Sequence, residues 1–231
     1  MRVFTIPDMD VEFLQHDSSQ AVCEDAYYLY LKVVSGILSP TPNRSVGGGK
    51  KVLDLGTGNG ILLLMLAKDF QDLFYTGIEI IKELCDIAVD NFERLCWYLN
   101  QRLNYRILNA DYSKLGEVLK EEKFDLIVSN PPYYHKGVGR MSSDIIKATS
   151  KFELTANLMQ LLHSIKSCLK HDGKSFIIFP FRRSDEFEAC CKTLALSIRS
   201  LEYIDYVAKS FHIDLEKLNS KTKVIYEVIH A

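Results

Sequence analysis

The chain has 231 residues, of which 47% are hydrophobic and 25% charged, and this composition is that of an ordinary globular protein. A chain of this length can form one α/β domain with a sizeable core, and it is too short for two full domains. The formal net charge of −2 excludes a strong attraction of the whole chain to nucleic acid or anionic membrane, so any nucleic-acid contact must come from a local cluster of Lys and Arg.

The N-terminal part predicts little regular structure apart from one helix. Residues 1–17 have no clear periodicity, and Ser18–Leu38 carries a broad apolar face at helical spacing. Ser39–Gly49 contains two Pro and three consecutive Gly, which is typical of a linker. We therefore divide the chain into an N-terminal segment, 1–49, and a main unit, 50–231, that together form a single domain.

From Lys50 onward, short apolar runs alternate with longer amphipathic segments. This alternation predicts a doubly wound, mostly parallel, seven-stranded Rossmann-like sheet. The last two predicted strands leave little room for a helix between them, so we expect the last one to be antiparallel, at the sheet edge. We expect strands at Lys51–Leu55, Leu73–Ile80, Tyr105–Asn109, Phe124–Ser129, Ser175–Pro180, Ser200–Val207 and Val224–Ile229, and helices at Ile61–Asp69, Lys82–Leu99, Phe152–Lys170 (ended by His171-Asp172-Gly173) and Ser184–Leu196.

The start of the chain, its apolar stretches and its cysteine spacing indicate in which cellular compartment the protein is expected. No basic segment followed by an apolar run opens the chain, so we expect no secretory signal. The apolar stretch Ile61–Ala67 is far shorter than the roughly 20 residues that span a bilayer. The cysteines form no Cys-x-x-Cys pair and have no histidine in ligand spacing, which predicts reduced thiols in a cytoplasmic protein, without a metal site or a disulfide framework. They lie at positions 23, 85, 96, 168, 190 and 191.

Three glycines, Gly56, Gly58 and Gly60, lie between the first predicted buried strand and the helix that follows it. Glycine lets such a loop turn tightly and lets a ligand approach bare backbone. A dinucleotide-binding loop would place its third glycine at Ile61, so this spacing disfavours an NAD-dependent oxidoreductase. Asp54 precedes the loop and could face the ammonium group of a methionine-like ligand without a pyrophosphate.

Acidic residues end the next two strands. Glu79 lies at the tip of the second strand, where a carboxylate can accept hydrogen bonds from both hydroxyls of a ribose. Asp111 follows the third strand and could accept a hydrogen bond from an adenine amino group. Because the carboxyl ends of parallel strands meet at one edge of the sheet, the loop and these acids predict a site for a nucleoside-containing cofactor.

The fourth strand runs into Asn130-Pro131-Pro132-Tyr133. Two prolines stiffen the backbone and remove two N–H donors, so the Asn130 amide oxygen and the Pro131 carbonyl can both accept N–H bonds from an amino group on an sp² carbon. Such an arrangement orients a weakly nucleophilic nitrogen without a strong general base. Tyr133 could stack on a planar acceptor. The alternative is a rigid corner with no chemical role, because Asn-Pro often opens a turn.

Together these segments resemble the class I S-adenosylmethionine-dependent methyltransferases, and the Asn-Pro-Pro-Tyr segment resembles that of N-methyltransferases acting on nucleobases or protein glutamine. More narrowly, the chain resembles the bacterial tRNA1(Val) (adenine(37)-N6)-methyltransferases. Besides the two motifs, this resemblance covers Gln15, Glu24-Asp25-Ala26, Gly137–Arg140 and Ser150–Leu154. It implies S-adenosylmethionine as cofactor, adenine N6 in tRNA as acceptor, and an N-terminal helix capping the cofactor site.

The resemblance also implies roles for single residues. Asn130, Pro131, Pro132 and Tyr133 would be catalytic. The cofactor would contact Asp54, Gly56, Gly58, Gly60, Glu79, Asp111 and Asp25. We expect Tyr134, Lys136, Arg140 and Lys151 to bind the substrate, with Lys147, Arg182 and Arg183 adding positive charge at the same edge. The family differs at Ala21, Glu24, Lys151 and Phe152, where it usually has a basic residue, a small hydroxyl residue and Arg-His; these differences bear on substrate choice.

Alternatives remain open. One is methylation of glutamine in a translation protein, although the residues before Lys50 leave too little room for the helical domain of the release-factor methyltransferases. The chain also has too little room for the separate target-recognition domain of DNA adenine methyltransferases. A different class of alternative is a non-catalytic RNA- or cofactor-binding protein with the same fold.

Overall fold

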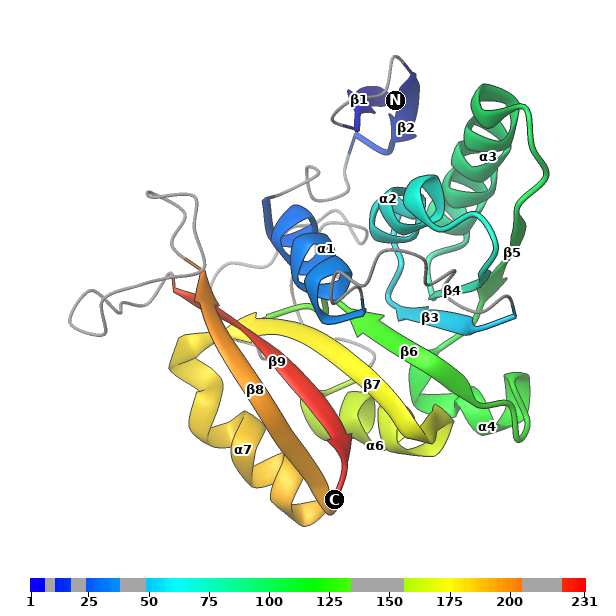
Figure 1. Cartoon of the computed structure of the whole chain (residues 1–231). Helices are drawn as coiled ribbons and strands as arrows, with labels where there is room; N and C mark the ends of the chain where they lie inside the picture. The colour runs from blue at the N-terminus through cyan, green and yellow to red at the C-terminus, as the bar shows by residue number, and fades with distance from the viewer. Residues whose placement is uncertain (7–10, 18–23, 38–48, 134–155, 205–221) are drawn as a thin grey trace.

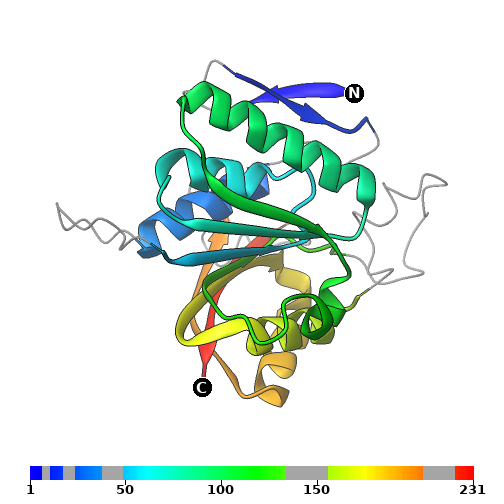
Figure 2. The same cartoon turned by 90° about the vertical axis from the view of Figure 1, so that its right-hand side faces the viewer.

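A computed structural model describes residues 1–6, 11–17, 24–37, 49–133, 156–204 and 222–231. Its centre is a seven-stranded sheet in the order β5-β4-β3-β6-β7-β9-β8, and the described helices lie on its two faces (Figures 1 and 2). All neighbouring pairs from β5 to β7 are parallel, and β9 pairs antiparallel with both β7 and β8. The predicted doubly wound sheet with an antiparallel last strand is confirmed. That strand, however, lies between β7 and β8, and the edge position belongs to β8.

The first half of the sheet follows the predicted order closely. It consists of β3 (Lys51–Leu55), α2 (Ile61–Asp69), β4 (Phe74–Glu79), α3 (Lys82–Leu99) and β5 (Asn104–Asn109). All residues from Leu62 to Ala67 are buried, because α2 is apolar on nearly all sides and must be covered on nearly all sides. The apolar periodicity of this region therefore predicted its elements to within a residue or two.

The second half shows larger differences from prediction. It contains β6 (Phe124–Ser129), α6 (Leu158–Cys168), β7 (Leu169–Pro180), α7 (Ser184–Thr193), β8 (Leu196–Ile204) and β9 (Lys223–His230). Helix α6 begins at Leu158, because Asn157 and Gln160 form a reciprocal capping box at its N-terminus. His171-Asp172-Gly173 does not end this helix: β7 starts at Leu169, and those residues lie where its pairing with β6 shifts register. Helix α7 ends early because Ala195 adopts a left-handed conformation, with φ of 49°.

Residues predicted to be irregular contain a β-hairpin, β1 (Arg2–Thr5) and β2 (Glu12–Gln15). Strands of four residues are too short to show a reliable period of two, and an isolated hairpin is only marginally stable in water. Here Asn91 of α3 provides the missing support: its side chain accepts from Leu14 N at 2.6 Å and donates to Leu14 O at 2.9 Å. The hairpin is visible beside α3 in Figure 2.

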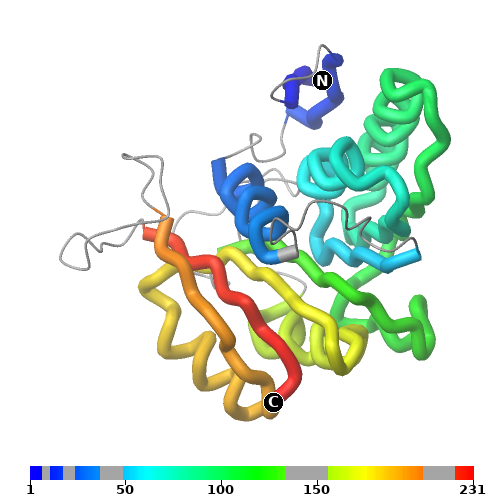
Figure 3. The backbone as a smooth tube through the Cα atoms, in the orientation of Figure 1, coloured from blue at the N-terminus to red at the C-terminus, as the bar shows by residue number. Residues whose placement is uncertain are grey.

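Two apolar layers fill the space between sheet and helices. Alternate strand residues such as Val52 and Leu53 pack into different layers. One layer lies under α1 (Glu24–Ile37), α2 and α3. The other lies under α4 (Leu115–Val118), α6 and α7. The path of the backbone through these layers can be followed in Figure 3. Two short 3-10 helices, η1 (Tyr112–Lys114) and η2 (Phe181–Arg183), were not predicted.

Membrane-spanning potential is low in the described helices, since none is both long enough and apolar enough to cross a bilayer.

Candidate active site

The glycine loop connects β3 to α2 at the carboxyl edge of the sheet. The backbone N–H groups of Gly56 and Thr57 donate to the carbonyl oxygen of Ile78 in β4 at 2.9 and 3.0 Å, which fastens the loop to the neighbouring strand. Gly58 has a φ of +57°, and no atom lies within 4 Å of the place where its Cβ would be. The loop therefore needs glycine for its conformation, and it presents accessible backbone.

Gly77 in β4 has a role that the sequence did not reveal. A Cβ there would lie 2.8 Å from Ile107 Cδ1 and 2.8 Å from Thr57 Cγ2. The close approach of the glycine loop to β4 is thus possible because this strand position has no side chain. An isolated glycine within a strand is a signal for close approach of another backbone, and it could have drawn attention to this position.

Glu79 ends β4 and is 7% exposed. Its Oε2 accepts from Gly58 N and its Oε1 accepts from Ile81 N, both at 2.9 Å. A carboxylate has about four acceptor positions, so both oxygens retain capacity for a pair of hydroxyl groups such as those of a ribose. Burial raises the pKa of the Glu79 carboxyl, and the hydrogen bonds from Ile81 and Gly58 oppose that rise.

Asp54 lies one strand away, 2% exposed. Burial raises the pKa of its carboxyl to about 7; the Thr57 side chain opposes the rise, and the charge of Glu79 adds to it. An ammonium group placed beside Asp54 would favour the ionised carboxylate. The position therefore suits the amino group of an amino-acid ligand.

Asp111 and Tyr112 follow β5. The Asp111 carboxylate accepts from Ser113 N at 2.8 Å and caps η1. The Tyr112 ring lies beside the glycine loop, since a Cβ on Gly56 would meet its Cε1 at 4.0 Å. Sequence reasoning selected Asp111 and missed Tyr112, although an aromatic residue directly after a strand-end acid was the available signal.

The Asn130–Tyr133 segment follows β6, and Ser129 ties its start to β3 by donating to Leu55 O at 2.8 Å. The Tyr133 hydroxyl lies within hydrogen-bond distance of two acceptors, Asn130 Oδ1 and, at 3.0 Å, Asp25 Oδ2. Tyr133 is 7% exposed, so stacking on an acceptor requires its ring to become uncovered.

Asp25 brings the N-terminal helix α1 to this corner. It is 5% exposed and forms an ion pair with Lys223, the first residue of β9. The Lys223 ammonium also lies 3.9 Å from the centre of the Tyr133 ring. Sequence reasoning placed Asp25 at the site and missed Lys223, because no local pattern distinguishes this lysine from the others in the sequence.

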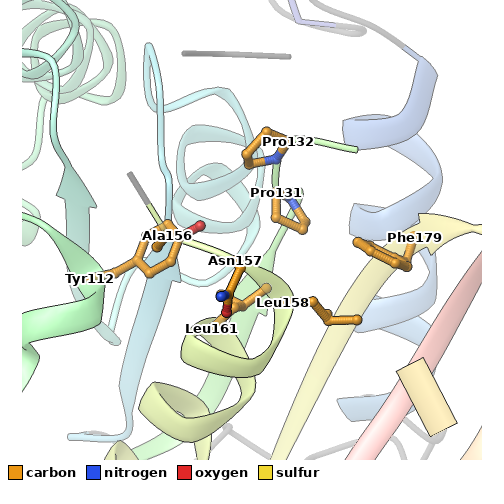
Figure 4. Close-up of a pocket in the computed structure, with 8 residues that line it drawn as sticks. All are labelled: Tyr112, Pro131, Pro132, Ala156, Asn157, Leu158, Leu161 and Phe179. Carbon is orange, nitrogen blue, oxygen red and sulfur yellow. The ribbon is translucent and has the colours of Figure 1, made fainter. Parts of the chain in front are cut away.

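A shallow apolar hollow adjoins Pro131 and Pro132 (Figure 4). In this view the two proline rings lie above the N-terminal turn of α6, with Tyr112 and Phe179 on opposite sides. Ala156, Asn157, Leu158 and Leu161 complete the lining. The hollow lies directly beside the predicted catalytic segment, and most of the residues that line it are apolar.

The residues expected to bind substrate, Tyr134, Lys136, Arg140 and Lys151, lie outside the described residues, as do Lys147 and Ala21. Arg182 is exposed after β7. Arg183, in contrast, is 7% exposed, pairs with both oxygens of Glu186 and donates to Tyr133 O at 3.1 Å. The prediction that Arg183 adds positive charge for nucleic acid is therefore wrong, because its guanidinium is buried and engaged by protein groups. In the described ranges, no cluster of three His, Cys, Asp or Glu side chains could hold a metal ion.

The strand ends thus bring together a glycine loop with open backbone, two buried carboxyls and the Asn-Pro-Pro-Tyr corner. Glu79 and Asp54 supply acceptors for hydroxyl and ammonium groups, and the open space at Gly58 admits a ligand close to the backbone. These groups fit the ribose and amino-acid portions of S-adenosylmethionine.

Comparisons with known proteins agree with this arrangement. The family described as "Methyltransferase domain" matches residues 47–211. The curated tRNA1(Val) (adenine(37)-N6)-methyltransferase of Mannheimia succiniciproducens is 28% identical over 158 residues, which are 64% of this chain and 62% of that protein. The chain spans about three fifths of the length of the curated relatives it matches.

Solved structures show the same fold. A methyltransferase from Pyrococcus furiosus has a TM-score of 0.60 at 19% identity, covering 97% of this chain and 92% of that one. A protein described as a methyltransferase and solved in complex with SAH has a TM-score of 0.61 at 13% identity, covering 90% of this chain and 50% of that one.

Proposed function

We propose that this chain, which belongs to the methyltransferase-domain family, transfers the methyl group of S-adenosylmethionine to an exocyclic amino nitrogen, namely N6 of an adenine in tRNA. The observation that carries the proposal is the placement of Asn130-Pro131-Pro132-Tyr133 at the same sheet edge as the glycine loop and Glu79. One set of residues would hold the cofactor, and the other would orient the acceptor.

On the cofactor side, Glu79 would accept hydrogen bonds from the ribose hydroxyls, and Asp54 would face the ammonium group. Asp111 and Tyr112 would lie at the adenine end, and Gly56, Gly58 and Gly60 would line the loop. When bound, S-adenosylmethionine supplies a methyl group attached to a positively charged sulfur, and this sulfur is the leaving group when a nitrogen lone pair attacks the methyl carbon.

On the acceptor side, Asn130 Oδ1 and the Pro131 carbonyl oxygen would each accept one N–H bond of the amino group. Both dipoles stabilise positive charge as it develops on the nitrogen, so the proton can be lost to water after transfer. The apolar hollow beside Pro131 and Pro132 lies next to this acceptor position.

The preference for tRNA adenine rests on the relatives. The curated relatives at 28–31% identity are described as tRNA1(Val) (adenine(37)-N6)-methyltransferases. In this proposal Tyr134, Lys136, Arg140 and Lys151 contact the RNA, and the exposed Arg182 adds positive charge at the same edge. A tRNA acceptor would also place the protein in the cytoplasm.

The test is transfer of isotopically labelled methyl from S-adenosylmethionine to total small RNA and, separately, to total protein. We expect label in small RNA, recovered as N6-methyladenosine after digestion to nucleosides, and its loss with Asn130→Ala. Label recovered in protein glutamine would show that the acceptor is a translation protein and not tRNA. Cofactor binding without transfer to either pool would contradict an enzymatic role.

A further inference from the structure

Lys223 reaches the active-site corner because of the direction of β9. This strand is antiparallel to β7, and its first residue, Lys223, pairs with Pro180, the last residue of β7. The start of an antiparallel strand thus lies at the edge where the parallel strands end. Of the strand's eight residues, this first one is at the edge that carries the Asn-Pro-Pro-Tyr corner.

The contacts of Lys223 join three distant parts of the chain. Its ammonium forms an ion pair with Asp25 Oδ2, and the side chains of Lys223 and Asp25 are 20% and 8% exposed. The same Asp25 oxygen is 3.0 Å from the Tyr133 hydroxyl, and the ammonium lies over the Tyr133 ring at 3.9 Å. Removing one partner of such a covered pair would leave the other charge buried without compensation.

The Tyr133 hydroxyl has one hydrogen and faces two acceptors, Asp25 Oδ2 and Asn130 Oδ1. An amide oxygen has two acceptor positions, and while the hydroxyl donates to Asn130 Oδ1 it occupies one of them, which weakens that oxygen as an acceptor for the substrate amino group. An ionised carboxylate is a stronger acceptor than an amide oxygen, so a carboxylate held at Asp25 can draw this hydrogen away from Asn130.

We propose that Lys223 is a positioning residue for methyl transfer. By holding the Asp25 carboxylate beside Tyr133, it directs the Tyr133 hydrogen to Asp25 and away from Asn130 Oδ1, the proposed acceptor for the incoming amino group. This inference rests on the proposed N-methyl transfer, and it assigns Asp25 a role in ordering the acceptor side as well as its expected place near the cofactor.

Lys32 offers a matched control. It pairs with Glu202, with side-chain exposures of 11% and 33%, and this pair also joins α1 to a C-terminal strand. Lys32→Met therefore removes a comparable ion pair between α1 and the sheet without touching Tyr133, Asp25 or Asn130.

The experiment compares Lys223→Met, Lys223→Arg and Lys32→Met in the full chain, with kcat and KM for the acceptor that the wild type methylates and cofactor affinity by calorimetry. We expect Lys223→Met to lower kcat by about 10- to 100-fold, since a misplacement of about 1 Å can cost about 100-fold, with cofactor affinity within about twofold. Lys223→Arg should restore most of the rate, and Lys32→Met should leave it unchanged.

A double-substitution cycle with Tyr133→Phe separates positioning from general support of the fold. Tyr133→Phe removes the hydroxyl that donates to Asn130, so Lys223→Met should lower kcat much less in the Tyr133→Phe background than in the wild type. If Lys223→Met lowers kcat equally in both backgrounds, the proposal is overturned. It is also overturned if Lys223→Met reduces cofactor affinity and leaves kcat unchanged.

A second measurement needs no acceptor. In protein with isotopically labelled tyrosine, the Tyr133 Cζ resonance, assigned by its absence in Tyr133→Phe, should move in Lys223→Met and not in Lys32→Met; an unmoved signal in folded protein contradicts the proposal. Absence of any methyl transfer by the wild type would instead contradict the proposed function, and this resonance would still report on Lys223.

Discussion

The cofactor side and the acceptor corner of the proposed active site are held in different ways. On the cofactor side, Glu79 is bonded to Gly58 and Ile81, which are 21 and 2 positions away in the chain. At the acceptor corner, Tyr133 meets Asp25 across 108 positions, and Asp25 meets Lys223 across 198. The first is a local structure built on backbone N–H groups, and the second is assembled by side chains from both ends of the described chain.

Because of this difference, substitutions on the two sides should impair cofactor binding and methyl transfer separately. Damage to the loop and Glu79 should weaken cofactor binding, because those groups touch only that side. Damage to the corner should slow transfer at saturating cofactor, because its residues act on the acceptor.

The largest effect is expected from Asn130→Ala. It removes an oxygen that orients the acceptor nitrogen and stabilises its developing charge, so kcat should fall by about 100-fold or more. Cofactor affinity by calorimetry should stay within about threefold. Asn104→Ala, at an exposed position in β5, is the control and should change neither quantity. An Asn130→Ala variant with full activity would remove the corner from the mechanism.

Glu79→Ala tests the other side. It removes the acceptor of two backbone N–H groups and of the ribose hydroxyls, and hydrogen bonds to charged groups contribute about 1.5–3 kcal/mol. Cofactor affinity should therefore fall by about 10- to 100-fold, while kcat at saturating cofactor changes less. Glu83→Ala removes an exposed acid in the first turn of α3 and should leave affinity unchanged. Equal affinity of Glu79→Ala and wild type would exclude Glu79 from the site.

Gly77→Ala tests whether the loop and β4 need their close approach. The added Cβ would lie 2.8 Å from both Ile107 and Thr57, and such overpacking costs about 1–3 kcal/mol of unfolding free energy. Urea denaturation should show this loss. Gly116→Ala is the control, since nothing lies within 4 Å of its Cβ position and alanine is favoured over glycine in a helix. A Gly77→Ala protein as stable as wild type would show that the loop can shift without cost.

The smallest effect is the pH dependence of cofactor affinity. The pKa of Asp54 is about 7 in the cofactor-free protein, and a bound ammonium lowers it, so binding below pH 7 must release a proton. Affinity should then fall by up to about tenfold per pH unit as the pH decreases from 7 to 6. Calorimetry in buffers of different ionisation enthalpy measures the released proton. The pH dependence should vanish in Asp54→Asn; if it persists there, Asp54 is not the group that titrates.

Much of the fold followed from local patterns in the sequence. The apolar runs of β3, β6, α2 and α3 ended at the predicted residues, because buried strands and amphipathic helices leave clear periodicities. Two predictions were wrong: residues 1–17 were expected to be irregular but contain the hairpin β1–β2, and β7 starts earlier than expected. Both depend on partners elsewhere: Asn91 supports the hairpin, and pairing with β6 extends β7 through residues that would favour a turn in isolation.

The glycine loop, Asp54, Glu79 and the Asn-Pro-Pro-Tyr segment could be proposed from local sequence, because their expected chemistry depends on neighbours within a few residues or on the ends of successive strands. Three features became visible only in the folded chain: Lys223 and Asp25 meet at Tyr133, Arg183 is buried against Glu186, and Gly77 must lack a side chain. The contacts at Tyr133 depend on the antiparallel path of β9 and on the packing of α1 on the sheet. Side chains that are brought together from distant positions in this way are not marked by any recognisable spacing in the sequence.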